Sequence, residues 1–348
     1  MKIALITGST GLVGSTASEF LIKKGFKIVG IDNDFRSKLF GKQSSTKIQK
    51  KRLILKKNYE HFNCDIRDHL KLEKIFKRYT NNIDLIIHSA AQPSHDWAYK
   101  DPMTDFDINA RSTLNLLNLT KKYCVNSVFI FLSTNKVYGD TPNKIKLTEK
   151  LSRWDVNKIS KFKNGITENM SIDKSIHSFF GTSKTYADLV VQEFGRNLNL
   201  KTGVFRCSCI TGPNHAGSKL HGFLSFLVKS CIKRREYELI GYKGKQVRDN
   251  IHSNDLSRAF WEFYKKPNKG EVYNMGGGRA TSCSPLEAIN YIEKKLNIKV
   301  RKKFTKQPRS GDHKWYITNI KKFKKHYPLW KIRYNFKSIM NEFINFYN

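Results

Sequence analysis

Acidic residues are scarce in this sequence. The chain has 348 residues, and 64 lysines and arginines face only 29 aspartates and glutamates, which gives a net charge of +35. Such a surplus is typical of nucleic-acid-binding proteins. However, the lysines are scattered through segments such as KKRLILKK (50–57) and NIKKFKKHY (319–327), without a basic motif interleaved with aromatic residues. We therefore favour a general compositional bias over RNA binding, and note that a basic surface also attracts anionic substrates.

Paired cysteines and long apolar runs are missing. The six cysteines form no CxxC pair and match no zinc spacing, so we predict reduced thiols and no metal site. The longest apolar runs, such as SVFIFLS (127–133), are too short to cross a bilayer. The N-terminus MKIALITGSTG imitates a signal peptide for only a few residues, and we interpret it as a buried strand. These absences predict a cytoplasmic protein that is not a membrane protein.

Short apolar runs alternate with helical patterns in the first half. The runs lie at 2–7, 27–32, 83–90, 127–133 and 201–206, and the helical patterns lie at 12–24, 68–79, 104–123 and 182–198. Continuous rather than alternating apolar strands, separated by helices, are typical of a parallel sheet that is buried on both faces. The sequence therefore predicts an α/β fold with a doubly wound (Rossmann) parallel sheet.

The pattern loosens after residue 206, where we predict a smaller C-terminal lobe that binds substrate. We assign residues 1–206 to the first domain and 207–348 mainly to the second, with the chain returning to the first near 251–276. A helix is expected near 219–234. Another is expected to start with Ser253 as its N-cap and to bury Leu256 and Ala259. The segments 33–59 and 140–178 are predicted to be long loops, and the length of the second suggests a lid.

A glycine-rich turn follows the first predicted strand. Gly8, Gly11 and Gly14 fall between that strand and a helix, where a tight turn, a close approach of backbone to a pyrophosphate and close helix packing need glycine. Asp32 ends the second strand, where a carboxylate can accept both ribose hydroxyls. Its charge would repel a 2′-phosphate, so the pattern predicts NAD rather than NADP, although Arg36 argues weakly the other way.

Five short stretches resemble a known family. HSAAQ (88–92), CDIRD (64–68), STNKVYGD (133–140), GTSK (181–184) and the glycine spacing resemble the extended short-chain dehydrogenase/reductases that act on nucleotide sugars. STNKVYGD and GKQVRDNIHSNDL (244–256) look most like the CDP-tyvelose (CDP-paratose) 2-epimerases. The resemblance runs from residue 1 to about 330. It implies a bound NAD, a nucleoside-diphosphate sugar as substrate and a homodimer formed by the helices at 104–123 and 182–198.

The resemblance also implies roles for individual residues. It places Thr134 and Lys184 at the reacting sugar and the nicotinamide ribose, Asn135 beside the substrate, and Arg248 and Arg309 at the substrate diphosphate. Its remaining cofactor contacts are Leu12, Val13, Asn33, Asp65, Ile66, Ser89, Ala90, Ala91, Asn109, Cys207 and Ser208.

The residues after Thr134 favour one reaction within the family. Related dehydratases carry an Asp-Glu pair there, whereas this chain has Asn135 and Lys136, so loss of water is not expected. The resemblance then implies epimerisation at C2 of a CDP-sugar, through transient oxidation to a keto sugar and return of the hydride. A C4 epimerase stays open as an alternative.

The stretch SFFGTSK (178–184) departs from the family pattern. Phe180 stands where most members have a tyrosine that accepts a proton. One explanation is that Tyr138, His95, His177 or a water held by Thr134 and Lys184 takes the proton. Another is that the protein is a redox-inactive scaffold that binds NAD and a nucleotide sugar.

Overall fold

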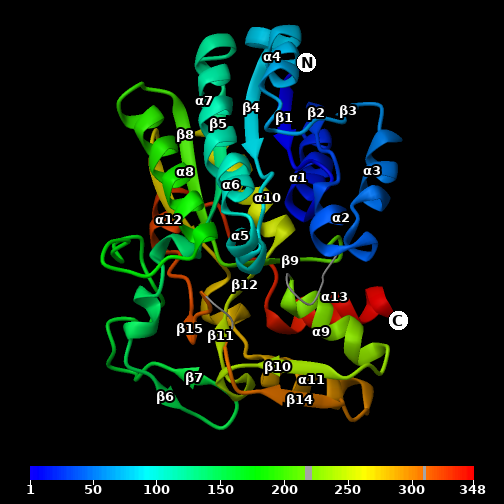
Figure 1. Ribbon diagram of the computed structural model, residues 1–348, viewed down its shortest axis with the longest axis vertical. Helices are drawn as coiled ribbons and strands as arrows, with labels where there is room; N and C mark the ends of the chain where they lie inside the picture. Colours follow the sequence, from blue (N-terminus) through cyan, green and yellow to red (C-terminus); the bar gives the residue numbers. More distant parts are fainter. Residues whose placement is uncertain (216–221, 309–310) are drawn as a thin grey trace.

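A seven-stranded parallel sheet forms the centre of the molecule. The computed structural model describes residues 1–215, 222–308 and 311–348. The strands are β1 (Ile3–Thr7), β2 (Lys27–Ile31), β3 (Tyr59–Phe62), β4 (Ile83–His88), β5 (Val128–Thr134), β8 (Lys201–Cys207) and β13 (Glu271–Met275). Their order is β13-β8-β5-β4-β1-β2-β3, and every neighbouring pair is parallel. The predicted doubly wound fold is confirmed (Figure 1).

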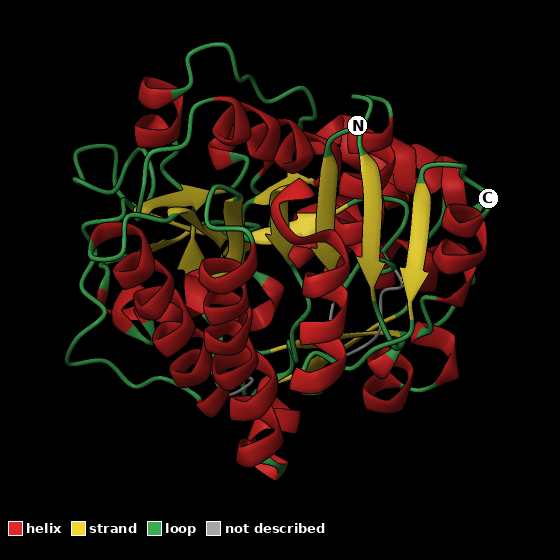
Figure 2. Cartoon of the chain, turned by 90° about the horizontal axis from the view of Figure 1, so that it is seen from above, coloured by secondary structure: helices red, strands yellow, loops and turns green. Residues whose placement is uncertain are grey.

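Helices cover both faces of this sheet (Figure 2). One face packs against α1 (Leu12–Ile22), α3 (Lys47–Ile54), α10 (Ser253–Lys265) and α12 (Lys321–His326). The other packs against α4 (His69–Tyr79), α7 (Ser112–Tyr123) and α8 (Phe179–Arg196). Because both faces are covered, the central strands are buried along most of their length and are mainly apolar, as in β1, where all five residues are buried.

The segment 33–59 in the first half of the chain contains more regular structure than predicted. The expected loop at 33–59 holds α2 (Phe35–Phe40), a 3₁₀ turn (Lys42–Ser44), α3 and the start of β3. These elements bury only isolated apolar side chains, such as Phe40 and Leu53, so the sequence has no clear periodicity there. The helix expected at 104–123 is present as α6 (Pro102–Phe106), a π-helical turn (Asp107–Arg111) and α7, and the short helix α5 (His95–Lys100), which was not predicted, precedes it.

The C-terminal part has an apolar core of its own. It is built by α9 (Phe223–Ile232), α11 (Pro285–Leu296), α13 (Phe336–Tyr347) and β10 (Tyr237–Ile240), and β10 pairs with the exposed strand β14 (Lys302–Thr305). Two further parallel pairs connect it to the sheet: β9 (Cys209–Thr211) with β12 (Asn250–His252), and β11 (Val247–Arg248) with β15 (Trp315–Tyr316). In Figure 1 these elements lie below the central sheet. The domain boundary at residue 206 stays a prediction.

The start of the helix near Ser253 and the segment 140–178 were both predicted from the sequence. Helix α10 begins at Ser253, so its N-cap is His252, whose Nδ1 accepts a hydrogen bond from the Asn254 N–H at 3.2 Å; the prediction of Ser253 as the cap was wrong by one residue. Leu256 and Ala259 are buried, as expected. The segment 140–178 contains a 3₁₀ turn (Thr141–Lys144) and the hairpin β6 (Thr148–Glu149) and β7 (Trp154–Asp155). It packs into a small core with Trp315, and its role as a lid stays a prediction.

Candidate functional site

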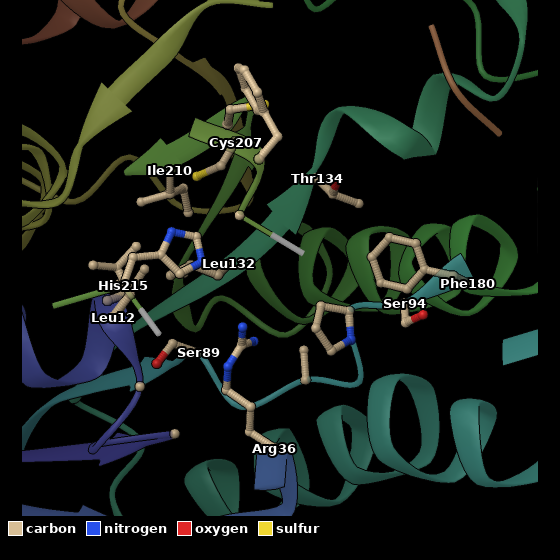
Figure 3. Close-up of a pocket in the computed structure, with 18 of the residues that line it drawn as sticks. Leu12, Arg36, Ser89, Ser94, Leu132, Thr134, Phe180, Cys207, Ile210 and His215 are labelled. Carbon is tan, nitrogen blue, oxygen red and sulfur yellow. The ribbon is translucent and has the colours of Figure 1, made fainter. Parts of the chain in front are cut away.

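A cavity of about 530 Å³ lies at the carboxyl ends of the central strands. Its walls come from the loops after β1, β2, β4, β5 and β8, and from β10, β11 and the segment around residue 311 in the C-terminal part. In Figure 3, Thr134 and Phe180 lie toward one end of the cavity, and Leu12 and His215 lie toward the other. A site at the end of a doubly wound sheet and between two lobes is where such folds bind ligands.

The glycine turn forms a cradle that side chains would fill. Gly8 has a φ of +67°, and a Cβ on it would lie 2.8 Å from the Ala90 nitrogen. A Cβ on Gly14 would lie 2.1 Å from the Gly8 carbonyl oxygen, so only glycine lets α1 approach the turn this closely. Helix α1 begins after Gly11 without a side-chain cap or an acidic residue in its first turn. Its N-terminal N–H groups therefore suit a pyrophosphate.

Asp32 is held beside this cradle by backbone donors. Its two carboxylate oxygens accept hydrogen bonds from the N–H groups of Thr10, at 3.1 Å, and Asp34, at 2.8 Å. Burial raises the pKa of Asp32. Each oxygen can accept one further hydrogen bond, so the carboxylate can bind both hydroxyls of a ribose. Arg36 also lines the cavity, with its guanidinium 4.9 Å from the centre of the Phe40 ring.

The opposite end of the cavity holds Lys184 and Thr134. The Lys184 ammonium donates to the Leu132 carbonyl oxygen at 2.7 Å and lies 4.1 Å from the centre of the Phe131 ring. Burial lowers the pKa of Lys184 to about 7. Thr134 ends β5, opposite Cys207 of β8, and its Oγ1 accepts the Lys136 N–H at 3.2 Å. This end therefore presents hydroxyl and ammonium groups to a ligand.

Phe180 lies in the first turn of α8 and lines the cavity. Of the side chains considered as substitute proton acceptors, Tyr138 is buried elsewhere, where it donates to Asn274 at 2.8 Å and accepts from Arg206 at 3.1 Å. Burial raises its pKa to about 12. His177 contacts the Ile172 carbonyl oxygen through Nε2 at 2.9 Å. Tyr138 and His177 are not among the residues that line the cavity. His95 does line it and lies against Phe180.

Two basic side chains of the cavity contact Gly311 and Asp312 on the C-terminal side. Arg248 forms an ion pair with Asp312, and its other guanidinium nitrogen donates to the Val247 carbonyl oxygen at 2.8 Å. Lys136 donates to the Gly311 carbonyl oxygen at 2.8 Å, and burial lowers its pKa to about 8. Arg309 lies outside the described residues.

Most residues expected from the sequence come together in this cavity. Those that line it are Gly8, Gly11, Leu12, Val13, Gly14, Asp32, Asn33, Asp65, Ile66, Ser89, Ala90, Ala91, Thr134, Asn135, Phe180, Lys184, Cys207, Ser208 and Arg248. Asn109 lies behind the wall, where it exchanges hydrogen bonds with the Gln92 backbone, each 3.0 Å long. Sequence reasoning missed Asp312 and His215 as lining residues, because they come from distant segments without a common motif.

The model of the NAD dependent epimerase/dehydratase family matches residues 4–276. The chain belongs to this family. A CDP-paratose 2-epimerase from Salmonella typhi is 31% identical over 330 residues, which cover 92% of this chain and 92% of that protein. A UDP-glucose 4-epimerase from Mycoplasma genitalium is 26% identical and covers 98% of this chain and 95% of its own length.

Solved structures of the epimerase/dehydratase family share the fold. A UDP-glucose 4-epimerase with UDP-glucose from Thermotoga maritima is 22% identical, with a TM-score of 0.79, over 99% of this chain and 98% of that one. The family uses NAD, which confirms the predicted cofactor, and the cradle and Asp32 fit it. Within the described residues, no helix combines the length and apolar character needed to span a membrane.

Proposed function

We propose that this family member is an NAD-dependent epimerase that inverts C2 of a CDP-sugar. The observation that carries the proposal is the pair Asn135 and Lys136, which lines the cavity directly after Thr134. Removing water from a sugar needs an acid for the leaving hydroxyl and a base for the carbon-bound proton, and a carboxylate pair suits both tasks. An amide and an ammonium do not. The similarity to a CDP-paratose 2-epimerase supports C2 as the reacting carbon.

The chain's own residues have separate tasks in this reaction. Bound NAD⁺ supplies a reversible acceptor for the hydride of the sugar carbon. Thr134 offers its hydroxyl to the oxygen of that carbon, because its Oγ1 has a lone pair and a rotatable proton beside the Lys136 N–H. Lys184 lies close to the same end of the cavity, and in its protonated form it favours negative charge that develops there. Arg248 suits a diphosphate oxygen through its planar fork once the ligand replaces Asp312.

The test is product analysis with purified protein and NAD⁺. We expect CDP-paratose or CDP-tyvelose to give the C2-inverted sugar, seen by NMR as a changed coupling between H1 and H2. In D₂O the product should keep protium at C2, because the hydride returns without exchange. UDP-glucose, examined in parallel, reports C4 inversion. Turnover of UDP-glucose, but not of any CDP-sugar, would move the reacting carbon to C4. That alternative is supported by the similarity to a UDP-glucose 4-epimerase.

Phe180 favours a second candidate, a redox-inactive protein that binds NAD and a nucleotide sugar. Phenylalanine carries no proton to exchange, and it lines the cavity at the place in α8 where the family pattern has a tyrosine. This candidate predicts that NAD⁺ and a nucleotide sugar both raise the melting temperature while no sugar nucleotide is converted. Detection of any C2- or C4-inverted product excludes it.

We also propose that two copies of the chain pair through α5, α6 and α8. Figure 1 shows these helices grouped at one side of the sheet. They carry a set of large exposed apolar side chains: Tyr99, Met103, Phe106, Phe179, Tyr186 and Leu189. Two pairs among them are in contact, Tyr99 with Phe179 and Phe106 with Tyr186, and a group of exposed apolar side chains of this kind is typical of an interface. Since the helices at 104–123 and 182–198 resemble those that form dimers in the family, a second copy is the partner that we expect.

A further inference from the structure

The loss of a phenol at position 180 coincides with a histidine at the same place in the cavity. His95 opens α5, and its ring meets Phe180 edge to face, with centroids 5.0 Å apart and planes at 70°. Both side chains line the cavity. The imidazole is therefore in contact with the ring whose hydroxyl is missing.

The His95 ring is held in one orientation. Its Nδ1 lies 2.6 Å from the Ser178 hydroxyl, which also caps α8 by accepting the Gly181 N–H at 3.1 Å. Gly311 packs against the same edge, since a Cβ built on it would lie 2.7 Å from Nδ1 and from Cε1. With Nδ1 engaged on this edge, the second ring nitrogen, Nε2, has no hydrogen bond to any described residue. Nε2 is thus the nitrogen that a ligand in the cavity can reach.

The charges around His95 keep the ring neutral before substrate binds. Burial lowers the pKa of His95 to about 3, and the Lys136 ammonium acts in the same direction, whereas the Asp312 carboxylate opposes it. A neutral imidazole has one nitrogen with a free lone pair. When the Ser178 hydroxyl accepts the Nδ1 proton, that lone pair is on Nε2.

The lysines of the cavity are less suitable as acceptors. Lys184 and Lys136 both use their side-chain nitrogen as a donor, to the carbonyl oxygens of Leu132 and Gly311. In their protonated forms, which exist below the lowered pKa values of about 7 for Lys184 and about 8 for Lys136, these ammonium groups have no lone pair and cannot take a proton. Protonated Lys184 instead places a positive charge in α8, one helical turn after Phe180.

We propose that Nε2 of His95 is the proton acceptor of this site and replaces the tyrosine that position 180 lacks. The assignment rests on the proposed function. The proton of the sugar hydroxyl moves to Nε2 while the O–H electron pair forms the carbonyl bond and the hydride of the same carbon leaves to bound NAD⁺. When the hydride returns to the opposite face, Nε2 gives the proton back to the oxygen. No other oxidant or reductant is needed, and the ring ends neutral.

The experiment compares His95→Ala, His95→Gln, His177→Gln and the double variant His95→Ala/Phe180→Tyr in NAD-loaded protein. General base catalysis contributes ~10²–10⁴-fold and is strongest when the pKa of the base lies near the working pH; because the pKa of His95 is lowered, we expect His95→Ala to lower kcat by about 10²-fold, the lower end of that range, with KM and NAD⁺ affinity nearly unchanged. His95→Gln should be equally slow, since an amide fills the space without a basic nitrogen. His177→Gln, a histidine outside the cavity, is the matched control and should behave as the wild type. The double variant, which regains a phenol, should recover activity, as should His95→Ala with added imidazole.

A second readout does not depend on turnover. Adding the CDP-sugar to NAD-loaded, ¹⁵N-labelled protein should shift the Nε2 resonance of His95, and CDP alone should leave it in place. Turnover by His95→Gln at the wild-type rate overturns the assignment but leaves the proposed function intact. A wild-type protein that converts no sugar nucleotide while Phe180→Tyr does so overturns both, and an unshifted Nε2 resonance overturns the assignment by itself.

Discussion

Replacing Asp32 by alanine tests the cofactor site most directly. In the structure the carboxylate accepts two backbone N–H groups and keeps one lone pair on each oxygen for the ribose hydroxyls. A hydrogen bond to a charged group contributes about 1.5–3 kcal/mol. Taking the lower value for both hydroxyls gives about 3 kcal/mol, which corresponds to about a 150-fold increase in the Kd for NAD⁺. The preference for NAD⁺ over NADP⁺ should narrow at the same time, because the charge that repels a 2′-phosphate is gone.

Isothermal titration calorimetry measures both dissociation constants. The variant also leaves the Thr10 and Asp34 N–H groups without their acceptor, so some loss of stability is expected even without ligand. Asp84→Ala is the matched control, because Asp84 also accepts a backbone N–H, that of Ile3 at 3.0 Å, but does not line the cavity. It should lose stability and keep its affinity for NAD⁺. If Asp32→Ala binds NAD⁺ within threefold of the wild type, the cavity does not hold the adenosine ribose at Asp32.

Three further predictions address the turn, the buried lysine and the dimer. Gly14→Ala should destabilise the protein by ~1–3 kcal/mol in urea unfolding and abolish measurable NAD⁺ binding, because its Cβ would lie 2.1 Å from the Gly8 carbonyl oxygen. Burial lowers the pKa of Lys184 to about 7, so between about pH 7 and pH 10 the unfolded chain binds a proton that the folded chain has released. The free energy of unfolding of the ligand-free wild type should therefore rise with pH in that window relative to Lys184→Met, and parallel curves would contradict the lowered pKa of Lys184. Leu189→Glu should convert a dimer to a monomer in light scattering without loss of helicity, because its side chain is exposed; an unchanged mass would exclude the proposed interface.

The sequence was informative where burial imposes a pattern. The run at 201–206 became β8 at Lys201–Cys207, because a strand covered on both faces is buried along most of its length and therefore carries an apolar run, here with the buried Arg206 paired to Asp188. In contrast, β3 was missed, since only Tyr59 of its four residues is buried at the edge of the sheet. The glycine turn and Asp32 were predictable because one local segment contains them. The contact between His95 and Phe180 was not, because it depends on how α5 and α8 pack, and no local pattern encodes that.

The separate apolar core of the C-terminal part has a consequence for how the molecule melts. One group of cavity walls is anchored in the cores beside the sheet, and the other in the cluster of α9, α11 and α13. Two cores that share few apolar side chains can lose their order one after the other. A dinucleotide bound at the glycine turn and Asp32 would contact mainly the first group of walls, whereas a sugar nucleotide that reaches Arg248 would contact both. Calorimetry should then record two overlapping transitions for protein with NAD⁺ alone, and a single sharper one when both ligands are present.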